Sequence, residues 1–195
     1  MQVDNNIQMP MITNKPGLFV KKPLYALYLA QFLSAFVDNM IMLIALAIIN
    51  RDGYPSYYLP LVQSAFLIPY IIFSPWVGRF ADRMSKSRVL LIGNGIKAMG
   101  ILAFFIGLDP AISNFIVGIG AVVYSPAKYG ILPLLTNNEE SLLNANSRIE
   151  TFTIIAILAG AVGGGFLADK SIMLALVISL ILYILSMVVN TFIPN

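Results

Sequence analysis

The sequence predicts an all-α membrane protein with six transmembrane helices, and three observations support this fold class. Of the 195 residues, 58% are hydrophobic and only 11% are charged, whereas soluble domains average about 25% charged residues. Basic residues gather in alternate short loops between apolar runs, as in membrane proteins. Each apolar run reaches or approaches the roughly 20 residues that cross a bilayer as a helix. We expect the six helices at residues 24–50, 59–77, 89–108, 112–135, 148–168 and 171–193.

The distribution of lysine and arginine predicts the orientation, because loops rich in these residues stay in the cytoplasm. Two basic residues of the loops, Arg51 and Lys170, fall on one side of the membrane. The other side holds eight, which are Lys15, Lys21, Lys22, Arg79, Arg83, Lys86, Arg88 and Arg148. We therefore read the net charge of +3 as a topology signal and not as a nucleic-acid surface. A multi-pass protein of the cell inner membrane with both termini in the cytoplasm is expected.

The absence of cysteine and histidine narrows the possible chemistry. Disulfides, thiolate catalysis, zinc sites of the Cys/His type and histidine acid–base catalysis are excluded. Nucleotide-binding glycine loops and the Gly-x-Ser-x-Gly nucleophile motif are also missing from the sequence. We therefore expect no enzyme activity, no metal site and no cofactor.

Residues 1–20 are polar and contain Pro10, Pro16 and Gly17. They lack the basic start, apolar centre and small-residue cleavage site of a signal peptide. This composition predicts a disordered cytoplasmic tail, so the membrane domain is expected to occupy residues 21–195.

The first predicted helix carries a charged residue, Asp38, near its middle. Gln31, Ser34 and Asp38 recur at steps of three and four residues and so share one helix face, with Asn39 beside them. A charge at the centre of a bilayer costs at least roughly 2.5–3.5 kcal/mol. Asp38 is therefore expected to face a cavity or a cation. The alternative is a neutral Asp38 that Asn39 or Gln31 holds within helix packing.

A short polar and basic stretch, Gly-Arg-Phe-Ala-Asp-Arg-Met-Ser-Lys-Ser-Arg at residues 78–88, separates the second and third apolar runs. It resembles the cytoplasmic loop between the second and third helices of major facilitator transporters, Gly-x-x-x-Asp-Arg-x-Gly-Arg-Arg-Lys. Ser85 stands at the second glycine of that pattern and Ser87 at a basic position. The resemblance implies a gating loop that braces one half of the transporter against the other. Its residues here are Gly78, Asp82, Arg83, Lys86 and Arg88.

Lys97 lies inside the third predicted helix, eight residues from its cytoplasmic start, which places it about 12 Å deep. Gly93, Lys97 and Gly100 share a face, so a neighbouring helix can approach closely there. Two interpretations stay open. Lys97 either extends its ammonium group to the membrane interface or lines a cavity.

The fourth predicted helix contains the run Tyr-Ser-Pro-Ala-Lys-Tyr-Gly-Ile-Leu-Pro at residues 124–133. Pro126 cannot donate to the carbonyl of Val122, which leaves an acceptor free and predicts a kink. Lys128 follows, about 10 Å from the cytoplasmic end of the helix. This cation within the predicted span is a further candidate for a cavity-lining charge.

The run at residues 125–133, together with Leu-Asn-Ala-Asn-Ser-Arg-Ile-Glu at 143–150, resembles the bacterial lysophospholipid transporters. The corresponding runs in that family read close to Gly-Pro-Ala-Lys-Tyr-Gly-Ile-Leu-Pro and Asn-Ala-Asn-Ala-Leu-Ile-Glu. Ser125 replaces a glycine, and Ser147-Arg148 replace Ala-Leu. The resemblance covers essentially the whole chain after residue 20. It implies the amino-terminal six-helix half of a major facilitator fold, with the second half absent.

The last two predicted helices carry less polar content. Glu150 is expected to open the fifth helix. Small residues then repeat at every fourth position, at Ala156, Gly160, Gly164 and Ala168. This spacing lets helix backbones approach within a bilayer, so we interpret the stripe as packing. The polar residues of the sixth helix are Ser179, Tyr183, Ser186 and Asn190, and we expect this helix to be scaffold.

The resemblance implies that the protein moves lysophosphatidylethanolamine-type lipids across the bacterial inner membrane by alternating access. The transported lipid would supply an inner-leaflet acyltransferase, which is a possible partner beside the lipid bilayer itself. Lys128 is expected to bind the lipid phosphate and Asp38 the amine, by charge-assisted hydrogen bonds. The predicted substrate-binding residues are Gln31, Asp38, Asn39, Lys97, Lys128 and Glu150.

Two other functions remain open. The chain could be half of a major facilitator transporter for another amphiphile or small solute, or a non-transporting membrane scaffold or truncated remnant. Its length fits a gene fragment, a split transporter with a separate six-helix half, or a half that forms a self-dimer. We favour a truncated or split gene and predict that the chain alone does not transport.

Overall fold

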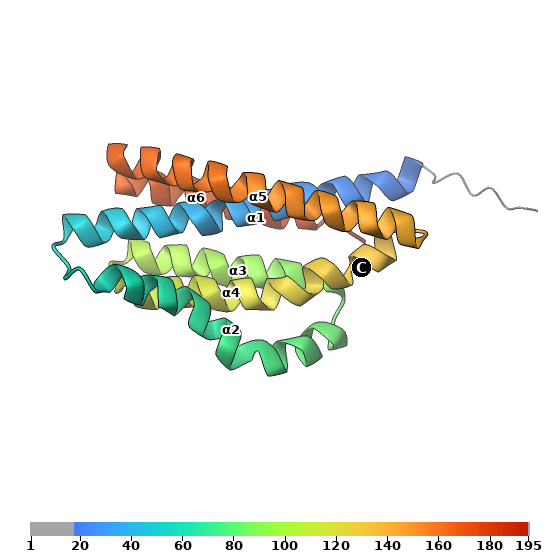
Figure 1. The fold of residues 1–195 in the computed structure, drawn as a ribbon, viewed down its shortest axis with the longest axis horizontal. Coiled ribbons are helices and arrows are strands. Elements are labelled where there is room, and N and C mark those ends of the chain that lie inside the picture. Colours follow the sequence, from blue (N-terminus) through green and yellow to red (C-terminus); the bar gives the residue numbers. More distant parts are fainter. Residues whose placement is uncertain (1–17, 195) are drawn as a thin grey trace, which may run out of the picture.

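The computed structural model describes residues 18–194 as a bundle of six long helices (Figure 1). Their bounds are α1 Leu18–Arg51, α2 Tyr58–Arg83, α3 Lys86–Phe105, α4 Pro110–Gly130, α5 Glu139–Lys170 and α6 Ile172–Asn190, with a 3₁₀ turn, η1, at Leu132–Leu135. All six are long and apolar enough to cross a membrane, and the described part of the chain contains no strand. The predicted all-α class with six transmembrane helices is therefore confirmed.

The first helix begins earlier than predicted, at Leu18 instead of residue 24. The remainder of the predicted tail, residues 1–17, lies outside the described residues. At the other end of the bundle, α5 and α6 are separated by Ser171 alone. Its side chain caps α6 by accepting a hydrogen bond from the Leu174 amide at 3.3 Å. The connection is thus one residue shorter than the two residues, 169 and 170, that separate the predicted helices.

The start of α5 corrects another prediction, because this helix begins at Glu139 and not at residue 148. The Asn138 side chain accepts a hydrogen bond from the Ser141 amide, and the Ser141 hydroxyl accepts one from the Asn138 amide. This reciprocal capping box fixes the helix start about two turns before the apolar run. Glu150 therefore lies well inside α5 and does not open it.

The stretch predicted as a gating loop is mostly helical, so the prediction that the second helix ends at residue 77 is wrong. Helix α2 continues through Arg83, and α3 begins at Lys86, so only two residues connect them. The Lys86 ammonium lies 2.7 Å from the Asp82 carboxylate and donates to the Ala81 carbonyl at 2.8 Å. These two contacts join the end of α2 to the start of α3.

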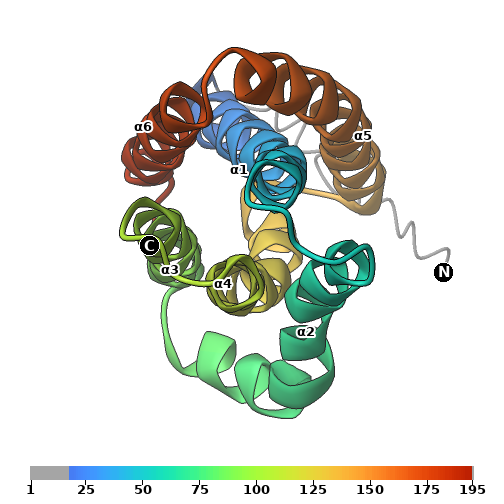
Figure 2. The ribbon, with the colours of Figure 1, turned by 90° about the vertical axis from the view of Figure 1, so that its left-hand side faces the viewer.

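Figure 2 shows the packing along the bundle, with α1 between α5 and α6, and α4 between α2 and α3. The α1–α5 contact depends on the small-residue stripe of α5. A Cβ atom at Gly160 would collide with the Phe36 carbonyl, and one at Gly164 would lie 2.7 Å from the Met40 Cα. The predicted packing role of this stripe is confirmed.

Helices α3 and α4 also pack backbone to backbone. A Cβ atom at Gly120 would lie 2.5 Å from the Gly93 carbonyl oxygen, and one at Gly100 would lie 2.9 Å from the Val117 amide. The predicted close approach at Gly93 and Gly100 is therefore confirmed. It holds Lys97, which lies between these two glycines, directly against α4.

The helices alternate in direction, so α6 ends at the end of the bundle where α1 begins (Figure 1). We call this the basic end, because the α2–α3 connection with Arg83 and Lys86 lies there as well. The opposite end carries the α1–α2, α3–α4 and α5–α6 connections, with Arg51 and Lys170 as its basic residues in the described chain. The protein is a multi-pass membrane protein.

Candidate substrate site

A central pocket of about 220 Å³ lies between α1, α2, α4 and α5, with one side chain contributed by α3. It is lined by five of the six predicted substrate-binding residues, Gln31, Asp38, Asn39, Lys97 and Lys128. The sixth, Glu150, lies beside Lys128. The remaining lining residues include three aromatic side chains, Phe66, Tyr70 and Tyr124. The fold therefore brings the predicted residues together from positions more than 100 apart in the sequence.

Asp38 and Lys97 form an ion pair inside the bundle. The Lys97 ammonium lies 2.7 Å from one carboxylate oxygen of Asp38, and the Tyr183 hydroxyl donates to the other at 2.6 Å. The Lys97 side chain is only 2% exposed, so the interpretation that it extends to the membrane interface is wrong. The cation that Asp38 was expected to face is supplied by the protein itself.

The two amides expected to hold a neutral Asp38 bond elsewhere. Asn39 donates to the Ala35 carbonyl at 2.8 Å, one turn earlier in α1. Gln31 donates to the Thr153 hydroxyl at 2.9 Å and so joins α1 to α5 across the pocket wall. Both amides thus line the pocket without contacting the carboxylate.

A chain of hydrogen bonds continues from Lys97 through the core. The Lys97 ammonium donates to the Ser34 hydroxyl at 2.9 Å, and Ser34 donates to the Asn94 side-chain oxygen at 2.8 Å. The Asn94 amide donates to the Ser186 hydroxyl, and Ser186 donates to the Ala30 carbonyl, each at 2.8 Å. Every hydroxyl in the chain donates away from Lys97, so Ser34 presents a lone pair to the ammonium.

This network contains residues that sequence reasoning did not assign to the site. Asn94 was not singled out, and Tyr183 and Ser186 were expected only as scaffold. The sixth helix does carry a signal, because its polar residues recur at steps of three and four and therefore form one stripe. All four residues of the stripe are fully buried, at Ser179, Tyr183, Ser186 and Asn190.

Lys128 is held more loosely than Lys97. Its ammonium lies 3.8 Å from Glu150 and 4.2 Å from the centre of the Tyr129 ring, while Tyr129 donates to Glu150 at 2.7 Å. A charge-assisted hydrogen bond is shorter, about 2.7–2.9 Å. The Lys128 ammonium therefore keeps hydrogen-bonding capacity for an anionic group in the pocket. Glu150, whose side chain is 45% exposed, can accept from a cation nearby.

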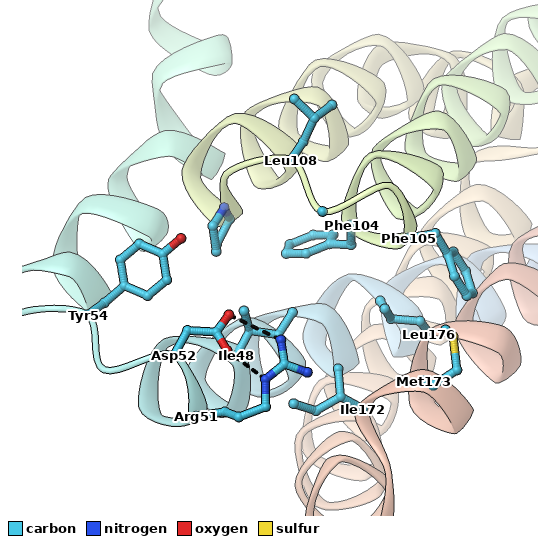
Figure 3. A pocket seen from close by; sticks show the side chains of 12 residues that line it. Ile48, Arg51, Asp52, Tyr54, Phe104, Phe105, Leu108, Ile172, Met173 and Leu176 are labelled. Atoms are coloured by element: carbon cyan, nitrogen blue, oxygen red, sulfur yellow. Dashed lines mark hydrogen bonds and ion pairs between the residues drawn. The ribbon is translucent and has the colours of Figure 1, made fainter.

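A second pocket, of about 230 Å³, lies at the end opposite the basic end, between α1, α3 and α6 (Figure 3). Arg51 donates two hydrogen bonds to Asp52 at its rim, at 2.7 and 3.1 Å. These bonds hold the pKa of the Asp52 carboxyl below its ordinary value. We call this the outer pocket. None of the predicted site residues lines it.

Comparison with known proteins gives two matches. The sequence profile of the Major Facilitator Superfamily matches residues 27–194. Proteins of Yersinia pestis (strain Pestoides F) and Yersinia pseudotuberculosis serotype O:3 (strain YPIII), both named lysophospholipid transporter LplT, are each 42% identical to the chain over 185 residues. The alignments cover 95% of this chain and 45% of each relative. The chain thus spans about half the length of these curated relatives.

Proposed function

Because the chain belongs to the Major Facilitator Superfamily, we propose that it takes part in moving lysophospholipids, of the lysophosphatidylethanolamine type, across the bacterial inner membrane. The names of the relatives support this substrate class, since both are lysophospholipid transporters. The predicted family resemblance, drawn from residues 78–88, 125–133 and 143–150, is confirmed by these matches. The substrate itself is our proposal.

The observation that carries the proposal is the unequal pairing of the two buried lysines in the central pocket. Lys97 and Asp38 neutralise each other at 2.7 Å, whereas Lys128 has a carboxylate partner only at 3.8 Å. A lipid phosphate would therefore bind at Lys128. Asp38, which we expected to hold the amine, already accepts from Lys97 and Tyr183. Glu150 is the carboxylate that is better placed for the amine of a zwitterionic headgroup.

Transport by alternating access requires the pocket to open on each side of the membrane in turn. We propose that the basic end faces the cytoplasm, as the positive-inside rule predicts. The corner between α2 and α3, closed by Asp82 and Lys86, would then brace the cytoplasmic side in the closed state. Gly78, Arg83 and Arg88 would complete this gating element. The transported lipid would become available to an acyltransferase on the inner leaflet.

The central pocket is bounded by one six-helix unit, and substrates of this superfamily bind between two such halves. We propose that a second six-helix unit, or a second copy of this chain, completes the cavity. The weakly buried helices α2 and α5 support this proposal, because only 22% of each membrane window is buried in the bundle. Their remaining surface is available to such a unit or to lipid.

The proposal is tested by uptake of lysophosphatidylethanolamine into cells or vesicles that contain the protein in its native assembly. Lys128→Gln removes the charge of the proposed phosphate ligand and should lower uptake at least roughly tenfold, the worth of one charge-assisted hydrogen bond. Lys22→Gln is the matched control, since Lys22 is exposed at the basic end, and it should leave uptake unchanged. Equal amounts of membrane-inserted protein are confirmed first.

Three results would speak against the proposal. Uptake that survives in Lys128→Gln would remove Lys128 from the substrate site. Wild-type transport of another amphiphile or of a sugar or drug, but not of lysolipid, would identify a different major facilitator substrate. A native assembly that transports none of these compounds would favour a membrane scaffold.

A further inference from the structure

The outer pocket is separate from the central pocket. Along α1, Arg51 follows Asp38 by 13 residues, which corresponds to about 20 Å of helix rise. Apolar side chains of the core, among them Ile44 and Ile101, lie along the intervening helices. No residue lines both pockets. The two pockets therefore have independent linings.

Most of the residues that line the outer pocket have apolar side chains, and one charged pair, Arg51 and Asp52, lies among them. Phe104 and Phe105 of α3 and Leu176 of α6 lie on one side of the pocket, and Tyr54 and the Arg51–Asp52 pair lie on the other (Figure 3). The pocket lies where α1 and α3 end and α6 begins. The ends of membrane-spanning helices lie at the level of lipid headgroups. Apolar side chains beside a charged pair at this level match the part of a phospholipid where the charged headgroup meets the apolar acyl chain.

The charged pair at the rim is accessible and only partly used. The side chains of Arg51 and Asp52 are 60% and 39% exposed. Arg51 donates to Asp52 through Nε and Nη2, so the N–H groups of Nη1 take part in neither bond. The turn at Gly107, with a φ of +73° and no atom within 4 Å of an added Cβ, leaves the adjacent wall unobstructed.

The balance of charge at the rim distinguishes between lipid headgroups. One guanidinium and one carboxylate sum to zero, so an anionic lipid gains an attraction to Arg51 and a repulsion from Asp52. A zwitterionic headgroup satisfies both, with its phosphate at Arg51 and its ammonium at Asp52. We propose that the outer pocket binds a zwitterionic phospholipid of the bilayer in this way, with the start of one acyl chain against Met173 and Leu176. This inference requires only that the chain spans a membrane and does not depend on the proposed transport.

The test is lipid binding by the purified 195-residue chain in detergent, followed by native mass spectrometry. Delipidated protein is titrated with phosphatidylethanolamine or phosphatidylglycerol of identical acyl chains. Wild type should prefer phosphatidylethanolamine. Arg51→Gln should weaken its binding roughly tenfold, as expected for a lost charge-assisted hydrogen bond. Asp52→Asn leaves Arg51 without a counter-charge and should reverse the preference toward phosphatidylglycerol.

The matched control is Lys170→Gln, which removes one positive charge from the same end of the bundle but not from the pocket. It should keep the wild-type affinity and preference. Equal binding of both lipids by wild type, or equal losses in Arg51→Gln and Lys170→Gln, would overturn the inference in favour of non-specific annular lipid. The lipid preference of Asp52→Asn is the ratio of its affinities for phosphatidylethanolamine and phosphatidylglycerol. Both affinities are measured on the same variant, so a lower stability of that variant does not alter the conclusion. An unreversed preference in that variant would also overturn the inference.

Discussion

The Asp38–Lys97 ion pair provides the sharpest test of the structure. Asp38→Asn removes the negative charge while keeping the shape of the side chain, and Lys97→Met removes the positive charge while keeping its length. Each single variant leaves the partner charge inside the bundle, where Lys97 is 2% and Asp38 17% exposed. The double variant removes both charges at once. Comparing the three isolates the interaction between the two residues.

The expected magnitudes follow from the cost of an unpaired buried charge. Breaking a buried ion pair from one side costs about 3–5 kcal/mol, whereas replacing both partners is often close to neutral. Each single variant should therefore lower the free energy of unfolding by about 3–5 kcal/mol. The double variant should remain within about 2 kcal/mol of wild type, so the two effects are strongly non-additive.

Reversible unfolding in mixed detergent micelles with increasing dodecyl sulfate measures these free energies. Lys128→Met is the matched control, because its ammonium lies 3.8 Å from a carboxylate that is 45% exposed. A pair at this distance with one exposed partner should contribute little more than a surface pair, which is worth about 0–1 kcal/mol. Lys128→Met should therefore destabilise the protein much less than Lys97→Met.

Additive losses in the double variant would refute the reasoning, since they would mean that Asp38 and Lys97 do not compensate each other. Transport then adds a second criterion. If the pair only supports the pocket, the double variant should recover uptake as well as stability. Recovered stability without recovered uptake would assign one of the two charges to the substrate.

Two further predictions concern the packing of α5 against α1 and the cap at the start of α4. Gly160→Ala places a methyl group against the Phe36 carbonyl and should destabilise the protein by about 1–3 kcal/mol. Gly165→Ala is the control in the same helix, because a Cβ there has open space around it. It should have little effect on the unfolding midpoint. Asp109→Ala removes the side chain that accepts from the first amides of α4 and from the Tyr58 hydroxyl, and should cost about 0.5–2 kcal/mol. Tyr58→Phe loses only the hydroxyl and should cost less; a larger loss in Tyr58→Phe than in Asp109→Ala would contradict this account of the cap.

Helix boundaries show where local sequence was sufficient and where it was not. The apolar runs identified the six membrane-spanning helices, because a span must bury its length in hydrocarbon whatever its neighbours are. Their ends depend on capping instead. The Asn138–Ser141 box starts α5 well before its apolar run, and α2 continues beyond Gly78 because a glycine alone does not end a helix.

The fold class, the packing stripe of α5 and the charged and amide residues that line the central pocket could be read from the sequence alone. These features depend on composition and on spacing within one helix, which a single chain displays directly. Which charges are paired became visible in the folded chain. Asp38 and Lys97 are 59 residues apart, and Tyr183 reaches the same carboxylate from 145 residues away. Which helices become neighbours depends on backbone contacts such as that of Gly93 with Gly120, and the spacing within a single helix does not encode the identity of its neighbour.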